Sequence, residues 1–349
     1  MNKNKKTYII FLHDKAVHFT SIGNHKKAIQ QYNKILKIDP NDFESLVNKA
    51  TTLSELGKFQ DALKYYDMAE KINPCDFDVL YNKATTLYDA GIYLDAISYF
   101  NKALKVKPQS IVALCNKANA LTALGKHDES INTYDKALRI SPDDPIILNN
   151  KGIVYAGQKN HKKAIFCFDK ASRIKPNDVD SLCNKGNSLS ELQKYREATD
   201  CFKKALKINP EDFDASMRLG MTLNEINKPK KAIPYFNKVL KHDPKNTDVI
   251  INKGISYHIL GRYIKALEYF DKALKYDNHD ANALYHKARS LAIQENDKET
   301  LDVLKLAFDE YEKHHEHNDK EEEIFKDRVR KDKSFLRLFN NTTFQKLVK

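Results

Sequence analysis

The sequence predicts an all-α protein made of a regular array of helix pairs. The prediction rests on a proline period, on an apolar period in phase with it, and on a composition poor in glycine. Seven prolines stand 34 residues apart without an insertion, at Pro40, Pro74, Pro108, Pro142, Pro176, Pro210 and Pro244. Leucine or isoleucine keeps the same period at Leu12, Leu46, Leu80, Leu114, Leu148, Leu182, Ile250 and Leu284. Only 10 of the 349 residues are glycine, which largely excludes glycine-rich loops that cradle phosphates.

Each 34-residue unit is expected to hold two antiparallel helices, helix A and helix B. Four positions after the leucine comes a small residue, at Ala16, Ala50, Ala84, Ala118, Gly152, Gly186, Gly220, Gly254 and Ala288. An aromatic residue follows on helix B, at Tyr32, Tyr66, Phe100, Tyr134, Phe168, Phe202, Phe236 and Phe270. Spacings of 3, 4 and 7 place the apolar residues of each half on one helical face. The small residue lets the two helices approach closely, and the aromatic ring is expected to fill the space between neighbouring pairs.

The ends of the helices carry signals of their own. Proline ends helix B because it cannot continue the hydrogen-bond ladder. Polar pairs then follow in several units, as in Asn41–Asp42, Asp143–Asp144 and Asn177–Asp178. Because Asp and Asn side chains can accept hydrogen bonds from the first backbone N–H groups of a helix, these pairs predict a cap for the next helix A.

A 34-residue helix–turn–helix unit with this pattern resembles the tetratricopeptide repeat family. The resemblance covers residues 9–314 as nine units, the last one degenerate, and leaves a basic leader at residues 1–8 and a C-terminal segment at residues 315–349. It implies a right-handed superhelical α-solenoid of about nine antiparallel helix pairs with a C-terminal helical cap. For the C-terminal segment, an autoinhibitory role is the alternative to a cap. The chain departs from the family in one respect, since it has no tryptophan early in helix A.

The two faces of helix A follow from its period. Each unit is numbered from the residue three before its recurring leucine. At about 100° per residue, positions 4, 7, 8 and 11 face the core, and positions 2, 5, 6, 9, 12 and 13 lie on the opposite arc. The resemblance implies that this second arc lines a concave groove, and we call it the helix-A face.

Asparagine recurs at position 6 of the helix-A face, although it is an indifferent helix former. Its amide offers a donor and an acceptor, so a row of amides can bond the backbone of an extended or helical peptide. The candidate binding residues are Asn48, Asn82, Asn116, Asn150, Asn184, Arg218 and Asn252 at position 6, Tyr81 and Tyr285 at position 5, Asn119 and Asn187 at position 9, and Glu55, Asp89, Glu191 and Glu225 at position 13. The alternative is that the asparagines form hydrogen bonds between repeats.

Basic residues exceed acidic ones by 59 − 47 = 12. A lysine column on helix B, expected on the convex side, accounts for much of this excess: Lys34, Lys102, Lys136, Lys170, Lys204, Lys238 and Lys272. The column is either a solvated surface or a surface that binds nucleic acid or another polyanion. Nucleic acid is the less favoured partner because no aromatic residue is expected among these exposed lysines. A second lysine row at position 7, including Lys49 and Lys83, is expected to pack its stems and extend its ammonium groups to water.

These features predict a non-catalytic protein–protein interaction scaffold that needs no cofactor and no metal. No Ser-His-Asp or Cys-His arrangement can be assembled from the sequence. The five cysteines form no CxxC pair, so neither a zinc site nor a disulfide framework is expected. His314, His315 and His317 form the one histidine cluster with metal-binding potential. A regulatory module for a separate enzyme is a further alternative.

The partner is expected to be a protein or peptide, whose identity the sequence does not give. No apolar run approaches 18 residues, so no membrane span is expected. The unpaired cysteine pattern favours a reducing, cytoplasmic location. Self-association through the terminal repeats is an additional prediction.

Overall fold

The structure is a computed structural model that describes residues 3–314 and 319–349. Every regular element within these residues is a helix, and the helices follow one another as packed pairs. The all-α class and the array of helix pairs are therefore confirmed. The chain divides into two compact units, Met1–Lys175 and Pro176–Lys349.

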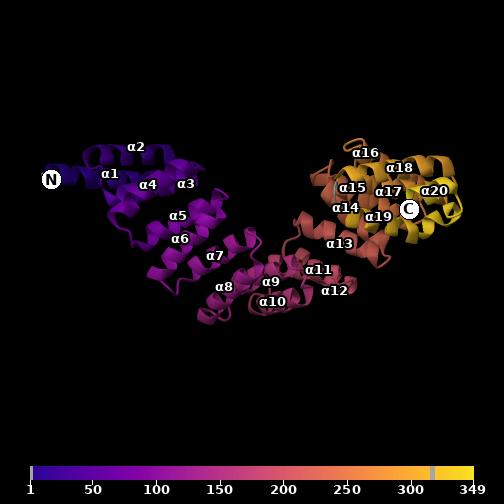
Figure 1. The fold of residues 1–349 in the computed structure, drawn as a ribbon, viewed down its shortest axis with the longest axis horizontal. Coiled ribbons are helices and arrows are strands. Elements are labelled where there is room, and N and C mark those ends of the chain that lie inside the picture. Colours follow the sequence, from indigo (N-terminus) through magenta and orange to yellow (C-terminus); the bar gives the residue numbers. More distant parts are fainter. Residues whose placement is uncertain (1–2, 315–318) are drawn as a thin grey trace. The chain divides into compact units, whose positions relative to one another are not determined.

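The first unit, coloured indigo to magenta in Figure 1, consists of five successive helix pairs. In each pair, helix A packs against the helix B that follows it. The helices are α1 (Lys3–Ser21), α2 (His25–Ile38), α3 (Phe43–Glu55), α4 (Phe59–Ile72), α5 (Phe77–Asp89), α6 (Tyr93–Val106), α7 (Ile111–Ala123), α8 (His127–Ile140), α9 (Pro145–Gly157) and α10 (His161–Ile174).

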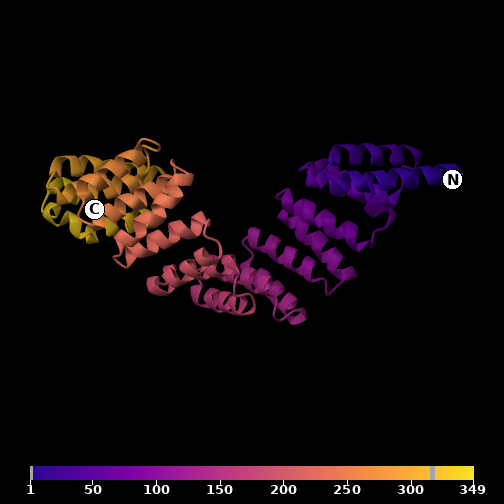
Figure 2. The ribbon, with the colours of Figure 1, turned by 180° about the vertical axis from the view of Figure 1, so that it is seen from behind.

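The second unit contains four more pairs, which Figure 2 shows from behind, and a group of shorter C-terminal elements. The pairs are formed by α11 (Val179–Glu191), α12 (Tyr195–Ile208), α13 (Phe213–Glu225), α14 (Pro229–His242), α15 (Thr247–Ile259), α16 (Tyr263–Leu274), α17 (Ala281–Ile293) and α18 (Asp297–His314). The C-terminal elements are α19 (Asp319–Lys331), the 3-10 helix η1 (Lys333–Leu338) and α20 (Thr342–Leu347).

Each helix A after the first begins at a polar cap. The cap side chain accepts a hydrogen bond from a backbone N–H of the first turn, at Asp42, Asp76, Ser110, Asp144, Asp178, Asp212, Asn246 and Asp280. The predicted caps at Asp42, Asp144 and Asp178 are therefore confirmed. Helix α2 ends at Ile38, and Asp39 is extended, because the residue before a proline avoids the helical region.

The two helices of a pair meet where the aromatic ring of helix B covers the small residue of helix A. A Cβ added at Gly152 would lie 2.5 Å from the Phe168 ring, and one added at Gly220 would lie 2.6 Å from the Phe236 ring. Phe236 is fully buried. The ring therefore fills space within its own pair as well as in the apolar clusters that join neighbouring pairs.

Two of the position-7 lysines, Lys49 and Lys83, do not extend to water as expected, whereas Lys15 is exposed. Only 6% of Lys49 and 5% of Lys83 is exposed. The Lys83 Nζ donates hydrogen bonds to Asp67, to Glu70 at 2.6 Å and to the Tyr99 hydroxyl at 2.6 Å. Burial alone would lower the pKa of Lys83, but these hydrogen bonds raise it above its ordinary value. For Lys83 the expectation was wrong because its carboxylate partners come from helix B of the preceding pair, which the geometry of a single helix does not include.

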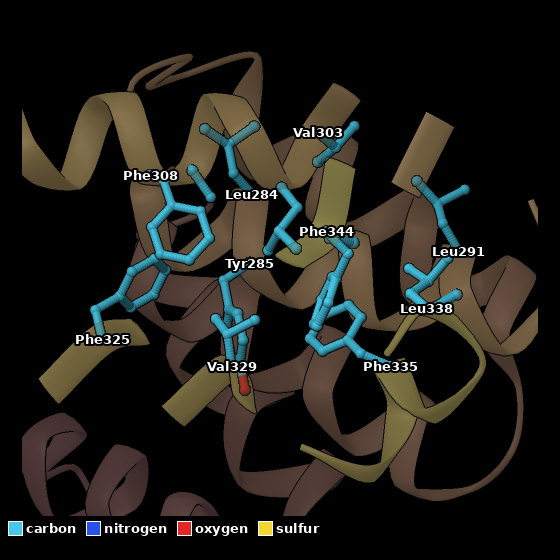
Figure 3. Close-up of a cluster of buried hydrophobic side chains, with 14 residues drawn as sticks. Leu284, Tyr285, Leu291, Val303, Phe308, Phe325, Val329, Phe335, Leu338 and Phe344 are labelled. Atoms are coloured by element: carbon cyan, nitrogen blue, oxygen red, sulfur yellow. The ribbon is translucent and has the colours of Figure 1, made fainter. Parts of the chain in front are cut away.

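The C-terminal elements pack on the last pair. Figure 3 shows Phe308 of α18 beside Phe325 of α19, with ring centroids 4.9 Å apart, and Phe335 beside Phe344 at 5.9 Å. All four rings are buried in one apolar cluster with Leu284 of α17. This part of the chain therefore covers apolar surface that the last pair would otherwise expose.

The boundaries expected at the two ends of the array stay predictions. Helix α1 begins at Lys3, inside the segment 1–8 that was expected to be a leader. The C-terminal segment was expected to begin at residue 315, and residues 315–318 lie outside the described part of the chain.

The contact between ring and small residue predicts a strong effect of one methyl group. Gly220→Ala should lower the free energy of unfolding by about 1–3 kcal/mol, because the new Cβ overlaps the Phe236 ring in a packed core. Thermal unfolding followed by circular dichroism measures the effect. Gly157→Ala is the matched control, since a Cβ there meets nothing within 4 Å. Equal midpoints for the two variants would contradict the prediction.

Candidate functional site

The helix-A face of the first unit carries asparagine on four helices in succession. Asn48, Asn82, Asn116 and Asn150 lie on α3, α5, α7 and α9, and each is half-buried. Within the described residues, the side-chain amides of Asn48, Asn82 and Asn150 form no hydrogen bond. These three amides therefore have donors and acceptors available for another molecule.

Two further amides of the first unit are engaged inside the protein. The Asn116 Nδ2 donates a hydrogen bond to the hydroxyl of Tyr81 on the preceding helix A, at 2.8 Å. The Tyr134 hydroxyl donates one to Asn119. Asn116 thus makes the bond between repeats that the alternative interpretation expects, and Asn119 holds helix B of its own pair.

The second unit carries a mixed row at position 6. The Asn252 Nδ2 donates to the backbone oxygen of Asp248 within α15, at 2.8 Å, and the Arg218 Nε donates to Asp214 within α13, at 2.8 Å. Asn184 is half-buried on α11. Two of the three side chains are thus tied to their own helix.

Four of the predicted residues come together in one cleft of the second unit. Asn187 and Glu191 of α11 face Arg218 and Glu225 of α13 across a volume of about 390 Å³. The rest of the lining consists of Ser190, Gln193, Tyr195, Phe202, Met221 and Thr222. We call this the α11–α13 cleft.

The α11–α13 cleft has a negative electrostatic character. Burial first, and then the negative charges of Glu225 and Glu191, raise the pKa of Tyr195. Neither glutamate forms an ion pair with any residue in the described ranges. The one guanidinium in the lining, Arg218, is paired with Asp214 at 2.8 Å. Two uncompensated carboxylates therefore face the cleft.

The other two predicted acids lie in the first unit and in different surroundings. Glu55 pairs with His25 at 3.4 Å. Asp89 is exposed at the end of α5, and partial burial of its carboxyl group raises its pKa. The four position-13 acids thus do not form one site, and the two from the second unit are the ones that share a cleft.

The helix-A face of α17 is covered by the C-terminal segment. Tyr285, at position 5, is 2% exposed, and its ring lies 5.7 Å from Phe325 of α19. The Arg328 guanidinium lies 4.3 Å above the same ring, and the Tyr285 hydroxyl donates to Asp332 at 2.6 Å. Arg289, at position 9, pairs with Asp332 at 2.6 Å. In this arrangement Tyr285 is not open to an external ligand.

Two neutral histidines lie beneath this contact. Burial lowers the pKa of His258 to about 4, and the nearby charge of Arg289 contributes. Burial and the guanidinium groups of Arg289 and Arg328 hold the pKa of His286 well below its ordinary value. His258 Nδ1 lies 2.9 Å from the hydroxyl of Ser290 on the next helix A.

The cysteines of the helix-A face and the metal-ligating side chains are the remaining candidates for chemistry among the described residues. Burial raises the pKa of Cys115 to about 11 and that of Cys183 to about 12, so neither thiol is a nucleophile at neutral pH. In the described part of the chain, no group of three or more His, Cys, Asp or Glu side chains is placed to hold a metal ion. His315 and His317 of the predicted cluster lie outside the described residues. Helices that could span a bilayer were not found in the described ranges.

Sequence reasoning missed Tyr195 of the α11–α13 cleft, whereas Ser190 and Met221 stand at positions 12 and 9 of the predicted helix-A face. Tyr195 opens helix B, and the wheel was applied to helix A only. A signal was present at Phe202, where other units carry tyrosine. A phenylalanine leaves the amide of Asn187 without the hydroxyl that Asn119 receives from Tyr134.

The helix-B surface also differs from expectation at one place. An exposed aromatic residue does lie among the lysines: Phe166 is 60% exposed, and the Lys170 Nζ lies 4.9 Å from its ring centroid. Together with Lys163 and Tyr155 they line a cleft of about 490 Å³. The sequence analysis did not identify Phe166.

Comparison with known families and structures identifies the repeat. Tetratricopeptide repeat models match residues 12–42, 31–64, 77–110, 145–178, 179–212, 213–246 and 248–280, and a TPR repeat model matches residues 118–159. No curated protein matches the chain.

Solved structures share the fold at low identity. In the APC/C hetero-tetramer Cut9-Hcn1, the match is 18% identical, covers 80% of this chain and 55% of that one, and has a TM-score of 0.54. YrrB, described as a TPR protein with an unusual peptide-binding site, is 28% identical over 54% of this chain and 97% of its own, with a TM-score of 0.49. A tetratricopeptide repeat protein from Parabacteroides merdae is 18% identical. The match covers 86% of this chain and 98% of that one, with a TM-score of 0.49.

The buried histidines predict a loss of stability in mild acid. The folded pKa of His258, about 4, lies below the ordinary value of 6.5, so the unfolded chain binds the proton first as the pH falls. The contribution of neutral His258 to the free energy of unfolding is complete above about pH 6.5. It should be smaller by about 2 kcal/mol at pH 5.

The variant His258→Asn tests this prediction by thermal unfolding at pH 7.5 and pH 5. Asparagine occupies the same position in the preceding repeat, where the Ser256 hydroxyl donates to Asn224 at 2.9 Å, so the bond between repeats can persist without titration. The variant should lose less stability than the parent, with a remainder due to His286. An equal loss in both proteins would refute the assignment to His258.

Proposed function

Because the chain belongs to the tetratricopeptide repeat family, whose members are generally non-catalytic protein-interaction scaffolds, we propose that its helix-A face binds a peptide segment of a partner protein. The unengaged amides of Asn48, Asn82 and Asn150 would bond the peptide backbone in the first unit. In the second unit the α11–α13 cleft would take a side chain.

The observation that carries the proposal is a contact within the protein. Helix α17 uses positions 5, 6 and 9, which are Tyr285, His286 and Arg289, to hold α19 and Asp332 of its own chain. The contact combines an aromatic pair, a guanidinium above a ring and an ion pair, which are ordinary components of peptide recognition. The same positions on other helices of the array are thus physically able to hold a helical or extended segment.

The unengaged asparagines Asn48, Asn82 and Asn150, which we call the amide row, favour contacts with the backbone of a peptide over contacts that depend on its sequence. Each asparagine offers one acceptor and two donors, whose geometry suits the N–H and C=O groups of a peptide. A half-buried amide loses less side-chain entropy on binding than an exposed one, because its neighbours already restrict it. Specificity would then come from the side-chain contacts at positions 5, 9 and 13.

Removal of the three unengaged amides tests the proposal. The peptides for this test are selected on the parent protein from a randomised phage library. Asn48→Ala, Asn82→Ala and Asn150→Ala together should weaken their binding by up to about 3 kcal/mol, at about 1 kcal/mol per hydrogen bond. Fluorescence anisotropy with the synthetic peptides measures the change. Asn116 stays in place because it bonds Tyr81.

The matched control replaces Asn33, Asn101 and Asn237, which are exposed on helix B, with alanine. This variant should bind the peptides like the parent. Unchanged affinity in the helix-A variant, with its circular dichroism intact, would reject the role of the amide row.

A second candidate function is the binding of single-stranded nucleic acid at the cleft that Phe166 lines. An exposed ring can stack on a base, and the lysines beside it can bind phosphates. Lys151, Lys163 and Lys170 line this cleft. Because Lys151 is paired with Asp135, the phosphate contacts of Lys163 and Lys170 predict that log K for an oligothymidylate falls against log salt with a slope of about −1.4. Phe166→Ala should weaken binding without changing the slope. A flat dependence between about 50 and 300 mM salt would remove this candidate.

A further inference from the structure

We propose that the α11–α13 cleft receives a basic side chain, lysine or arginine, from the partner peptide, held between Glu191 and Glu225. The inference rests on the proposed function, since it names the chemistry of the ligand at that same face. Three features of the cleft support it: the charges, the apolar walls and the unpaired polar groups.

The charges of the cleft are not balanced within the protein. The carboxylates of Glu191 and Glu225 come from position 13 of consecutive helices A and line the same cavity. Arg218 lies between them in sequence, but its Nε donates to Asp214 on the same helix, one turn away. The remaining charge is that of two carboxylates, and a cation from outside satisfies both.

The walls suit the stem of a long basic side chain. Tyr195 and Met221 provide apolar surface, and 38% of Met221 is exposed. Lysine and arginine bury their methylene stems on apolar surface while the charged end reaches polar groups. The Tyr195 ring is in addition a face on which a guanidinium can lie. The protein contains an example of that contact, since Arg328 lies 4.3 Å from the ring centroid of Tyr285.

Two uncharged polar groups are also available in the cleft. The Ser190 Oγ is buried and has no hydrogen-bond partner among the described residues. The Asn187 amide faces Phe202, which has no hydroxyl to bond it, whereas Asn119 accepts from Tyr134 in an earlier pair. A buried hydroxyl without a partner costs free energy, which a ligand with several N–H donors can recover. Arginine provides five such donors.

The volume of the cleft limits the ligand to a single side chain. About 390 Å³ lies near the lower end of the range for small-molecule pockets. A helix or a folded segment does not fit inside it, so the rest of the peptide would lie across the helix-A face. The protein as a whole is basic, with 59 basic and 47 acidic residues. The cleft is therefore a local acidic site, and it selects for a basic side chain of the partner.

The experiment pans a randomised 12-residue phage library on the full chain, on Glu191→Gln/Glu225→Gln, and on the control Glu129→Gln/Glu268→Gln. The control removes two exposed glutamates from helix B. Lysine or arginine should be enriched at one fixed position on the parent and the control, and not on the cleft variant. Circular dichroism melts establish that all three proteins are folded.

A synthetic peptide from the parent selection then measures the contact directly. Replacement of its conserved arginine by citrulline, or of lysine by norleucine, should weaken binding to the parent about 10- to 100-fold, the range for hydrogen bonds to charged groups. The same replacement should have little effect on the cleft variant, because the partner carboxylates are gone. Such coupling identifies the glutamates as the contact.

The outcomes separate the two claims. Peptides that bind without a conserved basic residue, or whose basic residue contributes equally on the cleft variant, overturn the basic-anchor inference and leave peptide binding intact. Failure to select any peptide on the parent overturns the proposed function, and the inference fails with it.

Discussion

The fold depends on the contact between an aromatic ring of helix B and the small residue at position 8 of helix A. At Gly152, Gly186, Gly220 and Gly254 there is no room for a Cβ, since each would lie 2.5 to 2.7 Å from a phenylalanine ring atom. This close approach buries one side of helix A and leaves the opposite arc for other contacts. A single pair cannot bury all its apolar surface, so the pairs stabilise one another as neighbours. The position of every candidate binding residue follows from that arrangement.

The sequence was sufficient for the features that depend on local periodicity. The helix ends before the repeated prolines, caps such as Asp42 and the close approach of the two helices at the small residue were predicted because each involves residues of one repeat, whereas the contact of that residue with the ring of its own pair was not. Some position-7 lysines were misjudged because their partners come from the preceding repeat: Lys83 pairs with Asp67, Lys151 with Asp135, and Lys287 with Asp271. In α12 the residue equivalent to Asp135 is Lys203, and position 7 of the following helix A is Leu219, so two positive charges are not placed together there. Comparison of neighbouring repeats would have revealed the pairing where this residue of helix B is an acid.

The candidate site illustrates the same limitation. Asn119 and Asn187 occupy equivalent positions and were predicted to act alike, but the aromatic residue opposite decides their roles. Tyr134 engages Asn119, and Phe202 leaves Asn187 to line a cleft. Helical-wheel geometry gives the direction in which a side chain points, and it contains no information about which hydrogen-bond partner lies there. The side chain opposite must be known before a repeated amide is interpreted as a binding group.

The contact between α17 and the C-terminal segment bears on whether that segment can be displaced. Phe325, Val329, Phe335, Leu338 and Phe344 are all buried by it, each at most 3% exposed. At about 1.5–3 kcal/mol per buried apolar side chain, their removal to water costs roughly 7–15 kcal/mol, an upper bound because an unfolded segment stays partly compact. A peptide that binds with micromolar affinity has a binding free energy of about 8 kcal/mol. It would bury only part of the surface that the C-terminal segment covers. The balance favours a permanent cap over a displaceable autoinhibitory segment, so the helix-A face available to a partner excludes α17.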